Sequence, residues 1–334
     1  MTTALRSALI VGAGIAGLAC ATELARAGIT VTLLDKGRRA GGRVATRRIQ
    51  GMAFNHGAQF ATARGEGFAT LLTQAQADGQ AAPWMAAGSD GRRIAFMPGM
   101  SALPAAMTVR AAMLGAVVMN ERHAAFLHPG DAGWHVRHLA AGELHAGAVA
   151  ESGGELSAAH DAVLLALPAP QARALLASAV HSFAAVAARA VMAPCWAVMA
   201  QFTEWVPGTD VLQNESGAIA WAAREGSRPG RAAHPDAWTL HASANWSRAH
   251  LEESAESVAQ ALLGEFRALA GAPAPDFAQA HRWRHALVEV AIDAPCLWDP
   301  AARVGACGDW CLGGRIEAAY DSGHSLAQCV LNTG

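Results

Sequence analysis

Three glycines near the start of the chain constrain the fold more than any other feature. Gly12, Gly14 and Gly17 lie between a short apolar run and a longer one, and Asp35 closes the next apolar run. We expect a strand, a helix and a second strand at residues 8–11, 16–27 and 30–34. In such a βαβ unit the first glycine permits a tight turn, the second lets a pyrophosphate approach the backbone, and the third lets helix and strand pack closely. The pattern therefore predicts a dinucleotide-binding site rather than a coincidental turn.

The start of the helix supplies the expected phosphate contacts. Ile15 and Ala16 open the helix, where backbone N–H groups have no partner within the helix and the dipole favours negative charge. Asp35 can accept hydrogen bonds from the ribose hydroxyls, and its neighbour Lys36 lies at the same adenosine end.

A second glycine pair distinguishes between dinucleotides. Gly41 and Gly42 precede Arg43 within residues 41–64, which are rich in glycine and arginine and are expected to form a long loop over a ligand. The glycines keep side chains off the diphosphate, and Arg43 can neutralise it with a forked donor. An NAD dehydrogenase usually lacks this pair, so the segment favours FAD. The alternative is a solvated arginine loop.

The C-terminal segment fits the other end of the same cofactor. Gly308 and Asp309 follow a short apolar strand, and Arg315 and Ile316 introduce a helix. We expect Asp309 to bond the ribityl chain and the helix start to direct N–H groups at flavin N1 and O2, where reduced flavin is anionic. A plain glycine turn before an amphipathic helix remains the alternative.

Composition narrows the choice of partners and location. The 334 residues carry a formal charge of −2 and are 52% hydrophobic, with no run of five like charges. Nucleic acid and anionic membrane are therefore not expected as partners. The six cysteines are scattered and are expected to be free thiols, no histidine spacing indicates a metal, and the apolar stretch 184–202 is broken by Arg189 and Pro194. We expect a cytoplasmic, soluble monomer or homodimer.

These elements predict an α/β fold with two domains. A Rossmann-like FAD-binding domain with a parallel sheet is expected to be discontinuous, formed by residues 1–80, 95–168 and 295–334. Residues 81–94 and 169–294 are expected to form a substrate domain on a mixed β-sheet with helices.

The three cofactor segments together resemble those of the amine oxidase and glutathione reductase-like flavoproteins, and within them most closely renalases of the bacterial type. The resemblance covers most of the chain. It is carried by NHGAQF at 55–60, MPGMSAL at 97–103, AVLLALPAPQA at 162–172, TLHAS at 239–243, RWRH at 282–285 and GDWCLGGRIEAAYDSG at 308–323. Asn55 stands where relatives commonly have an acid.

The resemblance implies an enzyme that takes hydride from 2- or 6-dihydro isomers of NAD(P) onto N5 of non-covalently bound FAD and reduces O2 to hydrogen peroxide. It places Phe60, His241 and Trp283 around the isoalloxazine. The loop residues expected at the cofactor are Gly57, Ala58 and Gln59. Taken without the resemblance, a lone histidine on an apolar strand such as His241 is more often a core residue, and Trp283 can equally be a pocket wall or a core residue.

Three other functions remain open. A flavin amine oxidase commonly uses a lysine near N5 and tyrosines around the amine, yet Lys36 and Tyr320 are the only lysine and tyrosine in the sequence. A carotenoid-type desaturase needs a membrane-docking surface, for which no amphipathic helix is found. A non-catalytic flavin-binding protein would keep the cofactor motifs and lose the substrate pocket. Hydride transfer from a dihydropyridine needs orientation and no protein base.

Overall fold

The computed structural model describes residues 5–140, 153–214 and 216–333. The chain divides into two compact units: Met1–Gly42, Leu103–Val191 and Val288–Gly334 form the first, and Arg43–Ala102 and Met192–Leu287 form the second. This division differs from the expected one chiefly at residues 43–80, which join the second unit, and at residues 169–191, which join the first. For residues 43–80 the physical reason is burial, because Phe54 packs against Met199 and Ala237 of the second unit.

The first unit is built on a six-stranded sheet in the order β17-β18-β11-β1-β2-β7. The strands are β1 (Ser7–Val11), β2 (Thr30–Leu34), β7 (Val117–Met119), β11 (Ala162–Leu165), β17 (Leu297–Asp299) and β18 (Val304–Ala306). Each described pair is parallel except β17–β18, which is antiparallel. The central strands β1 and β11 are almost wholly buried, as expected for apolar parallel strands covered on both faces. The expected Rossmann-like parallel sheet is confirmed.

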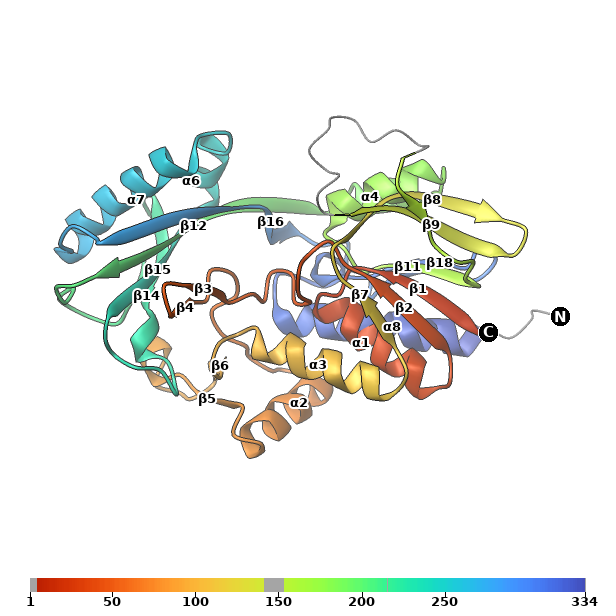
Figure 1. Cartoon of the computed structure of the whole chain (residues 1–334), viewed down its shortest axis with the longest axis horizontal. Coiled ribbons are helices and arrows are strands. Elements are labelled where there is room, and N and C mark those ends of the chain that lie inside the picture. Colours follow the sequence, from red (N-terminus) through yellow and green to blue (C-terminus); the bar gives the residue numbers. More distant parts are fainter. Residues whose placement is uncertain (1–4, 141–152, 215, 334) are drawn as a thin grey trace. The chain divides into compact units, whose positions relative to one another are not determined.

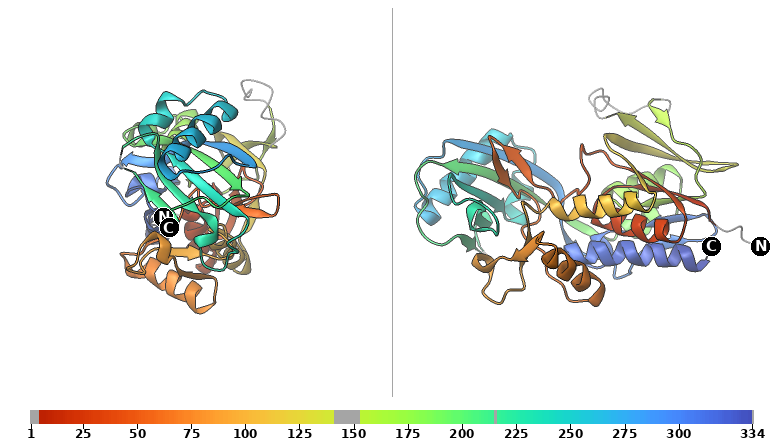
Figure 2. Two further views of the ribbon diagram at one scale, coloured as in Figure 1. Left: turned by 90° about the vertical axis from the view of Figure 1, so that its left-hand side faces the viewer. Right: turned by 60° about the horizontal axis from the view of Figure 1, so that its bottom comes forward.

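Two helices pack along each other against this sheet. They are α1 (Ile15–Arg26) and α8 (Ile316–Thr333), which lie side by side in Figures 1 and 2. A Cβ atom on Gly323 would lie 2.0 Å from the backbone oxygen of Ala16, so the close approach of the two helices requires glycine there. The first and the last helix of the chain are thereby packed together.

A small antiparallel sheet and further helices complete the first unit. The sheet has the order β10-β9-β8 and contacts β2 and β11. Its strands are β8 (Arg122–Gly130), β9 (Gly133–Ala140) and β10 (Glu155–Leu156), and the helices are α3 (Ala102–Met113), α4 (Ala169–Ser178) and α5 (Phe183–Ala187). Among the described residues, no helix has the length and apolar character that crossing a membrane requires.

The second unit is built on a five-stranded sheet in the order β13-β14-β15-β12-β16. The strands are β12 (Val191–Phe202), β13 (Val211–Gln213), β14 (Ile219–Arg224), β15 (Asp236–Ala242) and β16 (Phe277–Val290). The pairs β13–β14, β14–β15 and β15–β12 are antiparallel. This unit is the expected second domain of strands with helices.

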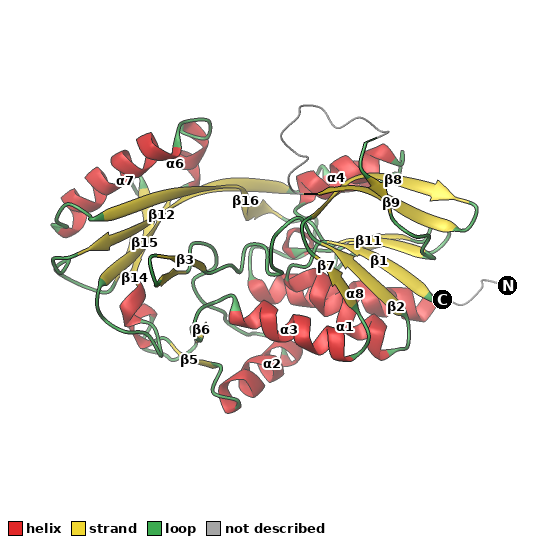
Figure 3. Cartoon of the chain, in the orientation of Figure 1, coloured by secondary structure: helices red, strands yellow, loops and turns green. Residues whose placement is uncertain are grey.

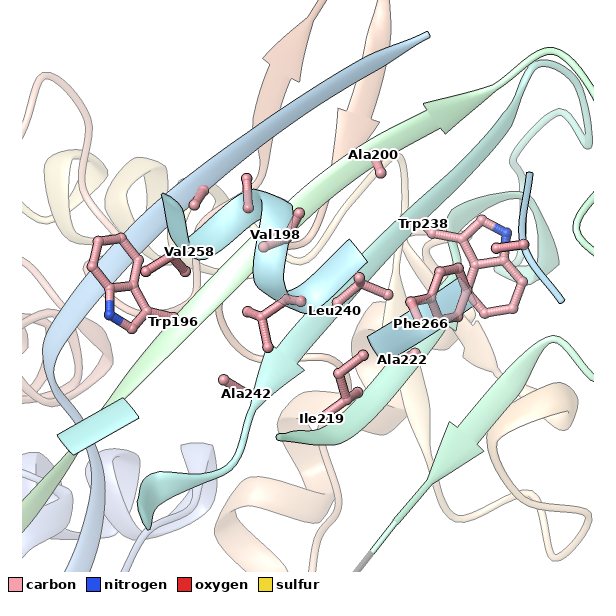
Figure 4. Close-up of a cluster of buried hydrophobic side chains, with 14 of the residues drawn as sticks. Trp196, Val198, Ala200, Ile219, Ala222, Trp238, Leu240, Ala242, Val258 and Phe266 are labelled. Carbon is pink, nitrogen blue, oxygen red and sulfur yellow. The ribbon is translucent and has the colours of Figure 1, made fainter. Parts of the chain in front are cut away.

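One face of this sheet packs against α6 (Ala244–Ala249) and α7 (Ala255–Ala270), seen in red in Figure 3. The Ser254 hydroxyl caps α7 by accepting from the Ser257 N–H, and Gly271, with φ 65°, ends it. Figure 4 shows the resulting core, in which Trp238 and Leu240 meet Phe266 of the helix. Burial of this face leaves the opposite face of the sheet for other contacts.

Residues 41–64, expected to be a continuous loop, contain a short hairpin. Strands β3 (Arg47–Ile49) and β4 (Met52–Phe54) pair antiparallel, and Gly51 turns between them with φ 80°. The remaining elements of the unit are α2 (Glu66–Ala77), β5 (Ala81–Pro83), η1 (Met85–Ala87), β6 (Ile94–Phe96) and η3 (Glu225–Ser227). The apolar residues Ile49, Met52 and Phe54 are too few to indicate a hairpin, and their burial fixes it.

Candidate functional site

The glycine turn after β1 has the geometry that its spacing predicts. Gly12 has φ 105°, and a Cβ atom on it would lie 2.3 Å from the Ala166 oxygen. A Cβ atom on Gly17 would lie 1.9 Å from the Gly12 oxygen. Both positions therefore require glycine for the turn and for helix packing.

Gly14 differs from its two neighbours, because it has free space around it. No heavy atom lies within 4 Å of a Cβ built on Gly14, and this residue is the N-cap of α1 without a side-chain hydrogen bond. The first turn of α1, which includes Ile15 and Ala16, contains no acidic side chain. The open backbone and the positive end of the helix, whose first N–H groups have no partner within the helix, fit a phosphate.

Asp35 lies directly after β2, beside this turn. Its carboxylate accepts hydrogen bonds from the N–H groups of Ala13 and Gly37, each at 2.7 Å. Burial raises the pKa of Asp35, and the two N–H donors oppose that shift. A carboxylate has further lone pairs, so Asp35 can hold the turn and still accept from ribose hydroxyls. Lys36 is exposed.

The second glycine pair passes over the first turn. The N–H of Gly41 donates to the Ala13 oxygen at 2.9 Å, and a Cβ on Gly42 would lie 4.0 Å from the Cα of Gly14. Arg43 begins the second unit, where its guanidinium donates to the Ala286 oxygen at 3.1 Å. Gly42 therefore lies with the glycine turn, and the Arg43 side chain lies with residues of the second unit.

The C-terminal segment reaches the same edge of the sheet as the glycine turn. Strands β1, β2, β11 and β18 are parallel neighbours, so their carboxyl ends share one edge. There Gly12 contacts Ala166, and the buried Trp310 donates its indole N–H to the Leu167 oxygen at 2.9 Å. The structure thus brings together two segments about 300 residues apart in the chain, at the edge where such sheets bind ligands.

Asp309 is held by the turn that starts α8. Gly308 has φ 156°, and Asp309 opens the short helix η4 (Asp309–Cys311) with its side chain buried. The Asp309 backbone oxygen accepts from the Gly313 N–H at 2.6 Å. Arg315 lies 3.5 Å from the buried Glu317 carboxylate, and Ile316 is the first residue of α8. Asp309 and the start of α8 are therefore neighbours, as the sequence predicts.

The sheet face of the second unit that points away from α7 carries aromatic and imidazole rings. Side chains alternate along a strand, so the residues next to Leu240 and Ala280 of the buried core point away from α7. Trp221 is the register partner of His241, and His281 and Trp283 follow on β16. The loop after β4 adds two rings that contact these. We call this set the aromatic face: His56, Phe60, Trp221, His241, His281 and Trp283.

The three histidines of the aromatic face are neutral near pH 7. Burial, and to a smaller extent neighbouring His281 and Arg47, lowers the pKa of His56 to about 3. Burial likewise lowers the pKa of His241 and of His281 to about 4. His241 Nε2 lies 3.1 Å from the His56 oxygen, and because a carbonyl only accepts, Nε2 carries the proton. His241 Nδ1 is then the nitrogen that can accept a hydrogen bond.

Gln59 holds the loop of residues 55–60 in place. Its amide nitrogen donates to the oxygens of Asn55 at 2.5 Å and of Gly57 at 2.9 Å, which uses both of its hydrogens. Its amide oxygen accepts from Arg228 at 2.5 Å. The Gln59 backbone oxygen also accepts from Arg228 Nη1, at 2.7 Å, so the side chain and the carbonyl group both hold the loop in shape.

Close packing explains the glycine within the same loop. A Cβ atom on Gly57 would lie 2.0 Å from the Arg43 oxygen, and Ala58 donates its N–H to that oxygen at 2.9 Å. Trp283 donates its indole N–H to the His56 oxygen at 2.8 Å, so that carbonyl also orients Trp283. Phe60 contacts Trp221 with ring centroids 5.8 Å apart. The loop thus links the three predicted residues Phe60, His241 and Trp283.

A buried charged group supports this arrangement, and sequence reasoning missed it. Glu225 accepts from the Asn55 N–H at 2.7 Å, from the Thr239 hydroxyl at 2.6 Å and from Arg228 Nε at 2.7 Å, and it also pairs with Arg231. The spacing of Glu225 and Arg228, three residues apart, was the available signal. No sequence signal indicated Trp221 or His281, because the face on which each side chain lies depends on strand register.

A separate cavity of about 530 Å³ lies elsewhere in the first unit. Its lining includes Arg6, Asp161 and Arg303, the residues that precede β1, β11 and β18. It therefore lies at the amino ends of the strands, the edge opposite to the glycine turn. Ligands of doubly wound sheets bind beyond the carboxyl ends, so we do not assign this cavity to the dinucleotide.

Comparison with known proteins agrees with the fold and with the glycine turn. Residues 10–74 match the NAD(P)-binding Rossmann-like domain family. The chain is similar to a proposed protoporphyrinogen oxidase from Exiguobacterium sp. 255-15, with TM-score 0.74 and 14% identity over 98% of this chain and 99% of the other. It is similar to cyclohexylamine oxidase from Brevibacterium oxydans IH-35A, with TM-score 0.70 and 12% identity over 98% and 99%. A triple mutant of putrescine oxidase matches with TM-score 0.66 and 13% identity over 98% and 99%. The chain therefore has the fold of these oxidases.

Proposed function

We propose that this protein is an FAD-dependent oxidase that oxidises 2- or 6-dihydro isomers of NAD(P) and reduces O2 to hydrogen peroxide. The observation that carries the flavin part is the shared sheet edge of the first unit. The open Gly14 turn, Asp35, the loop of Asp309 and the start of α8 all lie at this edge. A mononucleotide would need only the first of these segments, whereas an extended flavin dinucleotide uses all of them.

The residues of the first unit fit FAD in named positions. The N–H groups at the start of α1 would hold the pyrophosphate, with Gly42 beside it, and Asp35 would hold the adenosine ribose. Asp309 and the start of α8, with Arg315 and Ile316, would hold the ribityl chain and the pyrimidine edge of the flavin. Bound FAD supplies two-electron chemistry at N5, and the helix end favours its anionic reduced form.

Non-covalent binding of FAD is supported by the protonated state of two cysteine thiols near the proposed site. Cys307 precedes the proposed flavin-binding loop, Cys311 lies within it, and both are buried. Burial raises the pKa of Cys311 to about 12 and that of Cys307 well above its usual value. A thiolate is needed for attack on a flavin, so these two cysteines are poor points of attachment.

The aromatic face supports a dihydronicotinamide as the electron donor. Oxidation of the donor to the nicotinamide releases one hydride, and O2 with this hydride and one proton gives hydrogen peroxide. Because no proton leaves the donor with the hydride, the protein need only orient it. Trp283 and Phe60 offer ring surfaces for stacking, and neutral His241 can accept a hydrogen bond from the carboxamide through Nδ1.

Amine oxidation is the second candidate, and the likeness to cyclohexylamine oxidase and putrescine oxidase favours it. Two features of this chain count against it. Lys36, the only lysine, is exposed and follows Asp35 at the proposed adenosine end, and Tyr320, the only tyrosine, lies on α8. The second unit therefore contains neither a lysine nor a tyrosine to serve an amine.

Anaerobic stopped-flow mixing tests the proposal. The purified protein should absorb near 450 nm and release FAD on heat denaturation, and borohydride-reduced NAD isomers should bleach it within seconds. The 4-dihydro isomer, cyclohexylamine and putrescine are mixed with the protein separately, as comparison donors. Bleaching by the amines alone would establish the second candidate, and protein that takes up no FAD would refute both.

A further inference from the structure

Arg93 places a positive charge at the edge of the aromatic face. Its guanidinium carbon lies 4.9 Å from the centroid of the Phe60 ring and 5.9 Å from that of Trp221. Trp221 is the register partner of His241 on the neighbouring strand. A cation is thus held next to the rings to which we assign the nicotinamide.

The backbone around Arg93 is fixed on both sides. Ala61 and Ile94 form an antiparallel bridge, with N–H to oxygen distances of 2.8 Å and 2.9 Å, which places Arg93 beside Phe60. The Arg93 oxygen accepts from the Trp84 N–H at 2.7 Å. In the side chain, Arg93 Nη1 donates to the Ala87 oxygen. The guanidinium is therefore pre-positioned, and its Nε and Nη2 form the edge that can donate to two oxygens of one anion.

The charges around the aromatic face add to the effect of Arg93. Arg47 lies close enough to help lower the pKa of His56 and of His281, and Arg228 does the same for His241. Glu225 is shared between Arg228 and Arg231. The charged groups in these contacts leave a positive excess, which opposes a protonated amine and favours an anionic donor.

We propose that Arg93 is a substrate-binding residue that receives a phosphate of a pyridine dinucleotide whose nicotinamide ring lies on the aromatic face. The inference rests on the proposed function and deepens it, because it makes the dinucleotide phosphate a determinant of specificity. Arg93 selects for the phosphate and against cationic amines, and it takes no part in hydride transfer.

The test compares donors with and without phosphate. The donors are 6-dihydro-NADH and the matching 6-dihydronicotinamide riboside, mixed anaerobically with wild type, Arg93→Gln, Arg93→Lys and Arg92→Gln. Arg92 is the matched control, because its side chain is 83% exposed and its ion pair is with Asp90 on the surface. Thermal melts confirm that each variant is folded.

Arg93→Gln should raise the Kd of the dinucleotide donor roughly 10- to 100-fold, the effect of losing a charge-assisted bidentate contact. The limiting rate of flavin reduction and the Kd of the riboside should change less than about threefold, and Arg93→Lys should lie between. Arg92→Gln should match wild type. An equal loss for the riboside would show that Arg93 acts by packing, and an unchanged dinucleotide Kd would also overturn the inference.

An equilibrium measurement separates this inference from the proposed function. NAD+ and nicotinamide riboside are titrated into the protein, and binding is followed by tryptophan fluorescence. Inorganic phosphate is added as a competitor. If no dihydronicotinamide bleaches the flavin, the proposed function fails, yet NAD+ binding that depends on Arg93 would still support the phosphate contact. NAD+ binding that is equal in wild type and Arg93→Gln would refute it.

Discussion

Replacement of Gly14 by alanine separates cofactor binding from folding. An alanine Cβ at this position meets no atom within 4 Å, and the backbone, with φ −76° and ψ −175°, is one that alanine adopts readily. The space that the methyl group would fill is the space that we assign to the pyrophosphate. Gly14→Ala should therefore fold normally and lose FAD.

The magnitudes follow from two separate effects. Alanine is a poorer N-cap than glycine by roughly 1 kcal/mol, and it reduces the entropy of the unfolded chain by about 0.4–1 kcal/mol, so the free energy of unfolding of the apoprotein should change by less than about 1 kcal/mol. Displacing the pyrophosphate from two N–H donors costs roughly 1.5–3 kcal/mol each. The Kd for FAD should rise about 10²- to 10⁴-fold.

Fluorescence titration of apoprotein with FAD measures the affinity, and urea unfolding of the same samples measures the stability. Gly264→Ala is the matched control, because Gly264 also has no atom within 4 Å of an added Cβ and lies within α7 of the other unit. It should raise stability by up to about 1 kcal/mol and leave the Kd unchanged. A Gly14→Ala protein that binds FAD within about threefold of wild type would refute the placement of the pyrophosphate.

Four further predictions concern single residues. Gly17→Ala should unfold at lower temperature in calorimetry even without FAD, since its Cβ would lie 1.9 Å from the Gly12 oxygen. Asp35→Asn, which keeps an acceptor for one backbone N–H, should remain folded and weaken FAD binding about tenfold in the same titration. Because the folded pKa of His241 is about 4 and the unfolded value is 6.5, the unfolded chain binds a proton that the folded chain does not. Stability that is full above pH 6.5 should fall as the pH drops towards 4, less steeply in His241→Asn, and the flavin reduction rate should show no His241 titration above about pH 5. Glu225→Gln leaves two buried guanidinium groups without their carboxylate and should lower the urea unfolding free energy by about 3–5 kcal/mol.

The likeness to several oxidases and the rings of the aromatic face give different kinds of support. A shared fold at 12–14% identity hosts many chemistries, so it does not choose between an amine and a dihydronicotinamide. The choice depends on side chains: the neutral His241, the positive Arg93 and the position of the only lysine, Lys36. Donor specificity is therefore the decisive measurement.

The sequence by itself determined the parts of the molecule whose causes are local. The spacing of Gly12, Gly14 and Gly17 and the run that ends on Asp35 predict the first βαβ unit, because turn geometry and helix periodicity act over a few residues. The glycines at 41–42 and the segment at 308–316 could be assigned to the same ligand before any contact was known. The parallel sheet follows from strands that are apolar along their whole length.

Only the tertiary structure decided which distant residues meet. The pairing of Trp221 with His241, the bridge that brings Arg93 to Phe60, and the sharing of Glu225 all depend on strand register and burial. A shift of one residue in register would turn the strand side chains Trp221 and His241 to the other face of the sheet without changing the local pattern. The same reason explains residues 43–80, whose unit was decided by the burial of Phe54 and not by the turn that precedes them.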